Sequence, residues 1–177
     1  MDERLKDIEV QAGRHRDFES PPLHLWHPPL SGSIPICIRS DGKWYHEGDL
    51  VRRQSLVALF ASILRRESDS EYYLVTPSEK WRIQVDLHPL MVTDIEVVGE
   101  GEGQELEATL NTGKRLYING DHSLFTEPSV GGIAAINLPH GLTALFTRAA
   151  WYRLVDMADQ TEGVTSVRSA GETYILG

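Results

Sequence analysis

The sequence predicts an α+β protein of two tandem related units, each an antiparallel strand set packed on one amphipathic helix. Three observations support this prediction. Apolar residues alternate with a period of two in several short segments, they recur with a helical period over residues 56–63, and three motifs of the first half return in the same order in the second half. With 177 residues, of which 41% are hydrophobic, the chain can bury a core in one or two small domains.

The first 30 residues differ in composition from the rest of the chain. Residues 20–29 contain four prolines, and prolines at this density exclude a helix and favour extended backbone. Before them, only Leu5 and Ile8 suggest a weak helical period. We therefore expect residues 1–30 to form an extended, proline-rich arm. Trp26 should anchor this arm to the fold, because an exposed tail gains nothing from a tryptophan.

The first α+β unit is expected over residues 31–90. It opens with a β-hairpin, because isoleucines alternate over residues 34–38 before the turn residues 40–43 and the segment 44–46. A helix follows, since four apolar residues are spaced at i, i+3, i+4 and i+7, namely Leu56, Leu59, Phe60 and Ile63. Arg65 and Arg66 should end this helix, where their charges meet the negative end of its dipole.

Two strands should complete the first unit. Residues 72–75 and 81–85 carry the aromatic and β-branched side chains that are typical of strands. Between them, residues 76–79 have the form of a capping box with Pro77 in the first helical position. We therefore expect one helical turn to connect the two strands.

The second α+β unit is expected over residues 91–177. It begins with a hairpin of residues 91–98 and 105–110, whose connection contains three glycines that permit positive φ. The motifs that recur are residues 42–49 with 113–121, residues 56–60 with 142–146, and residues 71–74 with 172–175. Since 56–60 should be helical, the repeat predicts that 142–146 lie in a second helix, over about residues 138–158.

Charge and composition exclude several classes of function. The formal net charge is −9, and no basic stripe with interleaved aromatic residues is present, so nucleic-acid binding is not expected. The apolar runs are far shorter than the ~20 residues of a membrane span, and the first residues are too charged for a signal peptide. These features favour a soluble, cytoplasmic protein. Cys37 is the single cysteine, which excludes an internal disulfide and a multi-thiolate metal site.

Three local patterns resemble catalytic or ligand motifs, and none meets the requirements of its chemistry. His24 and His27 lie in a proline-rich stretch without helical geometry, so their spacing does not place them on one face as metal ligands. Residues 121–123 read Asp-His-Ser, but neighbouring side chains on a strand point apart. Residues 99–103 lack the Lys-Ser/Thr ending of a phosphate loop. We assign no metal, no cofactor and no catalytic residue.

The basic residues and many aromatic ones concentrate in the first unit, although the protein is acidic overall. Guanidinium groups suit carboxylate or phosphate ligands, and aromatic surfaces are typical of binding sites. The ligand-binding candidates are therefore Trp44, His46, Arg65, Arg66, Thr76, Glu79 and Lys80. Strand alternation directs Tyr45 away from Trp44 and His46. Alternatively, the arginines pair with acidic neighbours in residues 67–71, and Thr76 and Glu79 only cap a turn.

The sequence resembles the domain-of-unknown-function 1285 family of bacterial proteins from about residue 20 to the end. The resemblance rests on segments 21–29, 41–48, 56–60, 64–67 and 72–80. In the second half it rests on Asn111, Gly113, His122 and segment 141–149. It implies a fold of two repeated motifs that mix strands and helices, and a role in bacterial signal transduction. It implies no particular substrate, cofactor or catalytic residue.

The sequence favours a binding protein over an enzyme. The leading hypothesis is a non-catalytic, ligand- or protein-binding regulatory module that recognises a small anionic ligand or a protein partner. A second hypothesis is a small-molecule hydrolase or transferase whose acid and base come from separate strands, such as Glu79 with His46. A third is a homo-oligomer with a structural role only, in which the aromatic face is buried between subunits.

Overall fold

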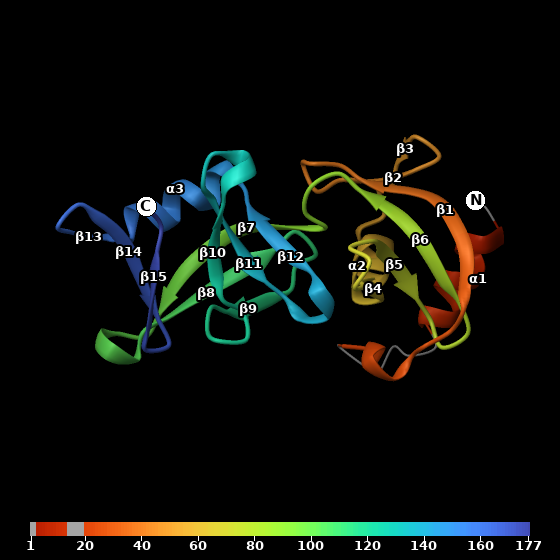
Figure 1. Cartoon of the computed structure of the whole chain (residues 1–177), viewed down its shortest axis with the longest axis horizontal. Coiled ribbons are helices and arrows are strands. Elements are labelled where there is room, and N and C mark those ends of the chain that lie inside the picture. The colour runs from red at the N-terminus through yellow and green to blue at the C-terminus, as the bar shows by residue number, and fades with distance from the viewer. Residues whose placement is uncertain (1–2, 14–19) are drawn as a thin grey trace. The chain divides into compact units, whose positions relative to one another are not determined.

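The computed structural model describes residues 3–13 and 20–177. The chain forms two compact units: unit 1 comprises the residues up to Leu87 together with His140–Leu142, and unit 2 comprises His88–Pro139 and Thr143–Gly177. The sequence predicts this division after residue 90, three residues further along the chain. Each unit contains its own six-stranded sheet (Figure 1).

Unit 1 is built on a mixed sheet of six strands. These are β1 (Leu30–Ile38), β2 (Trp44–His46), β3 (Asp49–Leu50), β4 (Leu64–Arg66), β5 (Tyr72–Val75) and β6 (Lys80–Val85). Their order across the sheet is β3-β2-β1-β6-β5-β4. All neighbours are antiparallel except β1 and β6, which run parallel at the centre. The expected hairpin of residues 34–38 and 44–46 is confirmed, with Ile36 opposite His46 and Ile38 opposite Trp44.

The N-terminal region differs from the extended arm expected over residues 1–30. It contains the helix α1 (Glu3–Gly13) and the short 3-10 helix η1 (Leu23–Leu25), while residues 14–19 lie outside the described part. Leu5, Ile8 and Ala12 are buried on one face of α1 at spacings of three and four. The prolines begin only at position 21, so they do not prevent a helix before them. Trp26 is buried, as expected for an anchor.

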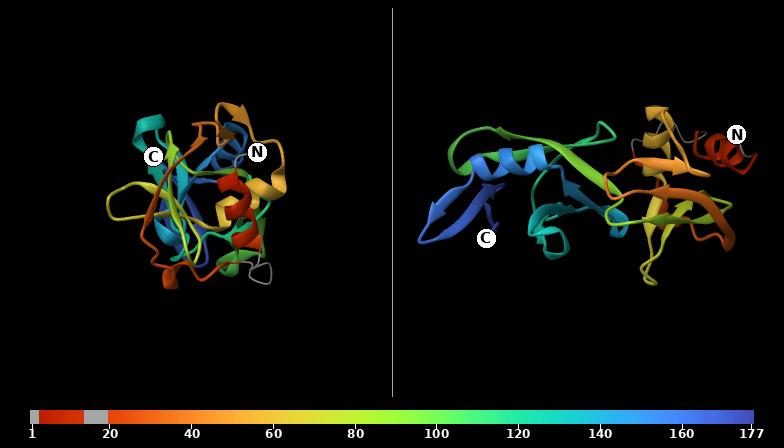
Figure 2. Two further views of the ribbon diagram at one scale, coloured as in Figure 1. Left: turned by 90° about the vertical axis from the view of Figure 1, so that its right-hand side faces the viewer. Right: turned by 90° about the horizontal axis from the view of Figure 1, so that it is seen from above.

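The helix α2 (Gln54–Ser62) confirms the helix predicted from the apolar spacing at 56–63. It buries Leu56, Val57 and Phe60, and α1 lies beside it (Figures 1 and 2). Arg65 and Arg66 do not end this helix, because the chain has already entered β4 there. Residues 76–79 form a tight turn without a helical turn. The Thr76 N–H donates to the Glu79 carbonyl oxygen at 2.9 Å, which reverses the chain between β5 and β6.

Unit 2 is built on a second mixed sheet. Its strands are β7 (Leu90–Val98), β8 (Glu105–Leu110), β9 (Arg115–Tyr117), β10 (Leu124–Glu127), β11 (Ile133–Asn137) and β12 (Thr143–Phe146). The order is β10-β11-β12-β7-β8-β9, and only β12 and β7 are parallel. The hairpin predicted for residues 91–110 is confirmed. Short 3-10 helices η2 (Gly101–Gly103), η3 (Pro128–Val130) and η4 (Pro139–Gly141) occupy three of the connections.

The C-terminal part of unit 2 adds a helix and a small sheet. The helix α3 (Arg148–Asp156) lies along β7 (Figure 2). The sheet consists of β13 (Asp159–Thr161), β14 (Val164–Ser169) and β15 (Glu172–Ile175), in that order. The fully buried Ser169 hydroxyl accepts from the Leu106 N–H at 2.8 Å and donates to the Ile118 carbonyl oxygen at 2.6 Å. These two bonds attach β14 to the six-stranded sheet.

The two sheets share one topology. When the strands of each unit are numbered from its first strand, both sheets have the order 3-2-1-6-5-4, with strands 1 and 6 parallel. Two tandem related α+β units are therefore confirmed, although each sheet is mixed and not purely antiparallel. The helices occupy different places in this order: α2 lies between the third and fourth strands of unit 1, whereas α3 follows the sixth strand of unit 2.

The prediction that residues 142–146 form part of a helix is wrong. Residues 143–146 form β12, and the second helix begins only at Arg148, after Thr147 caps it by accepting from the Ala150 N–H at 3.3 Å. Ala144, Leu145 and Phe146 are all buried, as in a central strand covered on both faces. A short apolar run of this kind does not distinguish strand from helix. The three motif matches therefore pair elements that are not equivalent, and the real repeat lies in the strand order.

Among the described residues, no helix is long and apolar enough to cross a membrane.

Candidate functional site

A cavity of about 340 Å³ lies in unit 1, over the sheet face that α1 and α2 cover. Its wall is mainly apolar and comes from four neighbouring elements: Leu5 of α1, Ile36 of β1, Trp44 of β2, and Leu56 and Phe60 of α2. Its polar lining consists of His46, Glu47 and Asp49. A largely apolar wall with a few polar groups is the usual composition of a small-molecule site.

The alternation of β2 brings Trp44 and His46 into this cavity. Both side chains lie on one face of the strand, and Tyr45 lies on the other. The Trp44 side chain is 1% exposed, and its ring centroid is 6.3 Å from that of Phe60. The sequence correctly placed Trp44 and His46 on one face, but it did not show that α1 would close this face.

Two ring nitrogens at the cavity are buried and have no hydrogen-bond partner among the described residues, namely Trp44 Nε1 and His46 Nε2. Leaving a buried polar group without a partner costs about 1–3 kcal/mol, and native proteins rarely do so. Both residues line the same cavity. This pair of nitrogens is the strongest chemical feature of the site.

The lip of the cavity is the tight turn between β2 and β3. Glu47 and Gly48 form this turn with positive φ values of 51° and 87°, the geometry of a type I′ hairpin. The turn carries two exposed carboxylates, Glu47 and Asp49, on the cavity lining. Among the described residues, no lysine or arginine lines the cavity. The local charge is therefore negative, in contrast to the basic surface that the sequence predicted.

Arg65 and Lys80, two of the predicted ligand-binding residues, are bound to groups of the protein itself. Arg65 Nη1 donates to the carbonyl oxygens of Leu23 and Trp26, both at 2.9 Å, and Nη2 donates to Glu67 at 2.6 Å. Lys80 Nζ donates to the other Glu67 oxygen at 2.9 Å. Burial alone raises the pKa of Glu67, but the bonds from Lys80 and Arg65 outweigh it and hold the pKa below its ordinary value. This cluster holds the proline-rich segment on the sheet.

Arg66, Thr76 and Glu79 also lie outside the cavity lining. Arg66 Nε donates to the Ser70 carbonyl oxygen at 3.3 Å, and the guanidinium lies over the Tyr72 ring. The Thr76 hydroxyl donates to Gln11 Oε1 at 2.7 Å, and Gln11 Nε2 donates to Glu79 at 3.0 Å. Both bonds attach α1 to the β5–β6 turn.

Of the seven predicted residues, the structure therefore brings only Trp44 and His46 together at the cavity. No hydrogen bond or ion pair joins Glu79 to His46 within the described residues, so the acid/base pair suggested from the sequence is not formed there. Sequence reasoning missed Leu5, Glu47 and Asp49. The Glu-Gly pair at 47–48, placed directly after a strand, was a usable hairpin signal for the last two of these residues.

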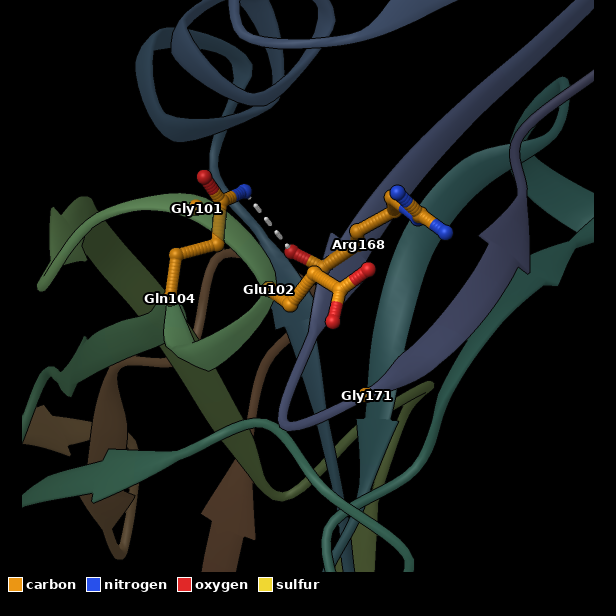
Figure 3. A pocket seen from close by; sticks show the side chains of 5 residues that line it. All are labelled: Gly101, Glu102, Gln104, Arg168 and Gly171. Atoms are coloured by element: carbon orange, nitrogen blue, oxygen red, sulfur yellow. Dashed lines mark hydrogen bonds between the residues drawn. The ribbon is translucent and has the colours of Figure 1, made fainter.

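A second cavity, of about 320 Å³, lies in unit 2 between the tips of two hairpins. It is lined by Gly101, Glu102, Gln104, Arg168 and Gly171, as Figure 3 shows. Gln104 Nε2 donates to the Arg168 carbonyl oxygen at 3.2 Å and so links the two tips. Glu102, Arg168 and the two glycines are exposed, and no buried side-chain atom without a partner lies among these residues. This cavity is the weaker candidate.

The buried His88 of unit 2 forms a hydrogen-bonded chain with two other side chains. Its Nδ1 is 2.7 Å from the Thr143 hydroxyl, and its Nε2 is 3.1 Å from Glu127 Oε2. The Glu127 carboxylate also accepts from Ser129. The order of groups resembles a nucleophile, base and carboxylate, but Thr143 lines neither cavity. These bonds tie the start of β7 to β10 and β12.

Among the described residues, no three His, Cys, Asp or Glu side chains gather closely enough to hold a metal ion.

Comparison with known proteins places the whole fold in one family. Residues 21–87 match the N-terminal domain of a domain of unknown function, DUF1285, and residues 89–176 match its C-terminal domain. A crystal structure of a DUF1285 protein from Silicibacter pomeroyi is similar with a TM-score of 0.82 at 36% identity, over 90% of this chain and 88% of that chain. No curated protein sequence matches the chain.

A second crystal structure, of a DUF1285 protein from Shewanella baltica, is similar with a TM-score of 0.58 at 27% identity. It covers 70% of this chain and 91% of that chain. The two matched domains divide at the same place as the two compact units, between Leu87 and residue 89. On these matches, and on its two sheets of one topology, the chain belongs to the DUF1285 family, whose function is unknown.

Proposed function

We propose that this protein is a non-catalytic, ligand-binding regulatory module, and that the cavity of unit 1 is the place where a small molecule binds. The observation that carries the proposal is the pair of buried nitrogens, Trp44 Nε1 and His46 Nε2, which have no partner among the described residues and lie at an apolar cavity. An indole N–H can only donate, so the ligand must present an acceptor to Trp44.

The size of the cavity limits the ligand. A buried apolar cavity of about 150 Å³ holds one benzene molecule. The cavity of unit 1 is about 340 Å³, which is enough for a ring with a short side chain. Trp44 and Phe60 provide aromatic surfaces for such a ring. We therefore propose an amphipathic ligand with a flat apolar part and a hydroxyl or carbonyl oxygen directed at Trp44 Nε1.

Binding fits the arrangement of these residues better than catalysis does. A general acid or base is usually oriented by a hydrogen bond from a neighbouring group. No such bond connects His46 to Glu47 or Asp49 within the described residues. The family resemblance implies a role in bacterial signal transduction. We propose that role as the process in which this ligand-binding module acts.

The test observes the Trp44 indole directly. The chain has four tryptophans, so a ¹⁵N-labelled sample gives a small set of indole N–H signals in an NMR correlation spectrum. Trp44→Phe removes one of them and so identifies it. Phenol and 2-phenylethanol, whose hydroxyl oxygens can accept a hydrogen bond, are then titrated into the native protein. We expect the Trp44 signal to move downfield in a saturable way, because the N–H gains an acceptor.

Two controls complete this experiment. Trp44→Phe keeps an aromatic wall but lacks the donor, and we expect it to bind the same compounds about fivefold to tenfold more weakly, the loss of one buried hydrogen bond. Trp151→Phe changes a tryptophan of α3 in unit 2, and its affinity should equal that of the native protein. The proposal fails if none of the compounds moves the Trp44 signal at millimolar concentration.

A further inference from the structure

We infer that the ligand of the unit 1 cavity carries a positively charged amine, held at the lip by Glu47 and Asp49; this inference rests on the function proposed above. The first support is the charge of the lining. Within residues 3–13 and 20–177, its ionisable groups are two carboxylates and one imidazole, and no lysine or arginine lines it. An anionic ligand would meet repulsion there, whereas an ammonium group would meet two opposite charges.

The second support is that both carboxylates are available. Glu47 and Asp49 take part in no ion pair with a described residue, and both side chains are exposed. In the same unit, other carboxylates are engaged, as Glu67 is with Lys80 and Arg65. A ligand in the cavity can therefore reach Glu47 and Asp49 without breaking an existing ion pair.

These observations orient the ligand. Its ring would lie against Trp44 and Phe60, its oxygen would face Trp44 Nε1, and its amine would point outwards to Glu47 and Asp49. The tryptophan face also favours a nearby cation. The class of ligand is thus a small arylalkylamine or cyclic amine with a hydroxyl or carbonyl group, and it differs from the anionic ligand expected from the arginines in the sequence.

The test compares three compounds that share a phenyl ring and a benzylic hydroxyl and differ in charge: 2-amino-1-phenylethanol (the amine), 1-phenyl-1,2-ethanediol (the alcohol) and mandelate (the carboxylate). Each is titrated into the native protein at low salt while the Trp44 indole signal is followed. We expect the amine to bind about fivefold more tightly than the alcohol, and mandelate to bind more weakly than either. High salt should remove most of the preference, because exposed charges are screened.

The variant Glu47→Gln/Asp49→Asn tests the residues. It should bind the amine and the alcohol about equally, with the affinity for the alcohol unchanged from the native protein. Glu102→Gln, which removes an exposed carboxylate of unit 2, is the matched control and should keep the preference for the amine. Thermal unfolding of both variants shows whether they remain folded. The affinities of the double variant are compared with those of the native protein when the double variant is folded.

The outcomes separate this inference from the proposed function. If the alcohol binds as well as the amine to the native protein, the inference is wrong and the ligand-binding function stands. If mandelate binds most tightly, the inference is also wrong and the site takes anions. If none of the three compounds perturbs Trp44, while phenol does, only the inference fails. If no compound perturbs Trp44, both fail.

Discussion

At the scale of single residues, the chemistry of the site depends on which polar groups already have partners. Trp44 Nε1 and His46 Nε2 are buried without one among the described residues. In contrast, Arg65 donates to Glu67 and to two backbone carbonyl groups, and Lys80 donates to Glu67. Residue type alone favoured the arginines as ligand-binding groups. The contacts favour the aromatic residues instead, because a group that is already bonded gains little from a ligand.

The Glu67 cluster predicts a specific dependence of stability on pH. The folded pKa of Glu67 lies below its ordinary value of 4.5, so the carboxylate stabilises the fold fully above that value. This stabilisation is lost as the pH falls through the folded pKa. Glu67→Gln should lower the free energy of unfolding by about 2 kcal/mol at neutral pH, since it leaves Arg65 and Lys80 without their carboxylate.

The measurement is urea unfolding of the native protein and of Glu67→Gln across the acidic range. The difference between them should shrink as the pH drops below about 4.5, because the native carboxyl group also becomes neutral there. Glu71→Gln, which changes an exposed carboxylate outside this cluster, is a suitable control and should show little difference at any pH. A difference for Glu67→Gln that stays constant with pH would contradict the role assigned to its charge.

At the scale of elements, the β2–β3 hairpin carries strain that a substitution can relieve. Asn tolerates positive φ and is the residue preferred before glycine in a type I′ turn. We therefore expect Glu47→Asn to raise the free energy of unfolding by about 0.5–1 kcal/mol. Denaturant unfolding measures this change. Glu47→Gln keeps the strain and should leave stability nearly unchanged, so an equal gain in both variants would show that charge, not backbone conformation, was responsible.

The helix α1 is a structural part of unit 1 and contributes to the cavity wall. Ile8 is fully buried on the face that packs beside α2, whereas Val10 is 54% exposed. Ile8→Ala should therefore lower the free energy of unfolding by about 2–4 kcal/mol, and Val10→Ala should change it by less than about 0.5 kcal/mol. Urea unfolding monitored by circular dichroism distinguishes them. Equal, small effects would mean that α1 is not packed on the core in solution.

At the scale of the whole molecule, each unit has a core of its own. Phe60 is buried in unit 1 and Phe146 in unit 2, both at 1% exposure. Replacing either by alanine should cost about 3–5 kcal/mol in the unit that contains it. Hydrogen exchange followed by mass spectrometry should show lower protection of the β1–β6 sheet in Phe60→Ala, and of the β7–β12 sheet in Phe146→Ala. Equal loss of protection in both sheets for either variant would show that the units unfold as one.

Local patterns predicted much of this molecule. The alternation at 34–38, the helical spacing at 56–63 and the glycine-rich connection at 99–104 each led to the observed element, because the partner strand or the covering face lies close in sequence. Trp44 and His46 were also assigned to one face by alternation alone. The α+β class followed from the same periodicities. The family was identified from the resemblance of other segments, and the two related units were predicted from motif matches that pair elements that are not equivalent.

Only the tertiary structure decided the rest. Whether the apolar run at 142–146 became strand or helix depended on the parallel partner β7, more than fifty residues earlier in the chain. Whether Arg65 and Lys80 were free for a ligand depended on Glu67 and on the carbonyl groups of a distant segment. The cavity exists because α1 covers a face that β2 presents. Contacts between distant segments set these outcomes. The hydrophobic periodicity of a segment indicates in which direction its side chains point, but not which groups they contact.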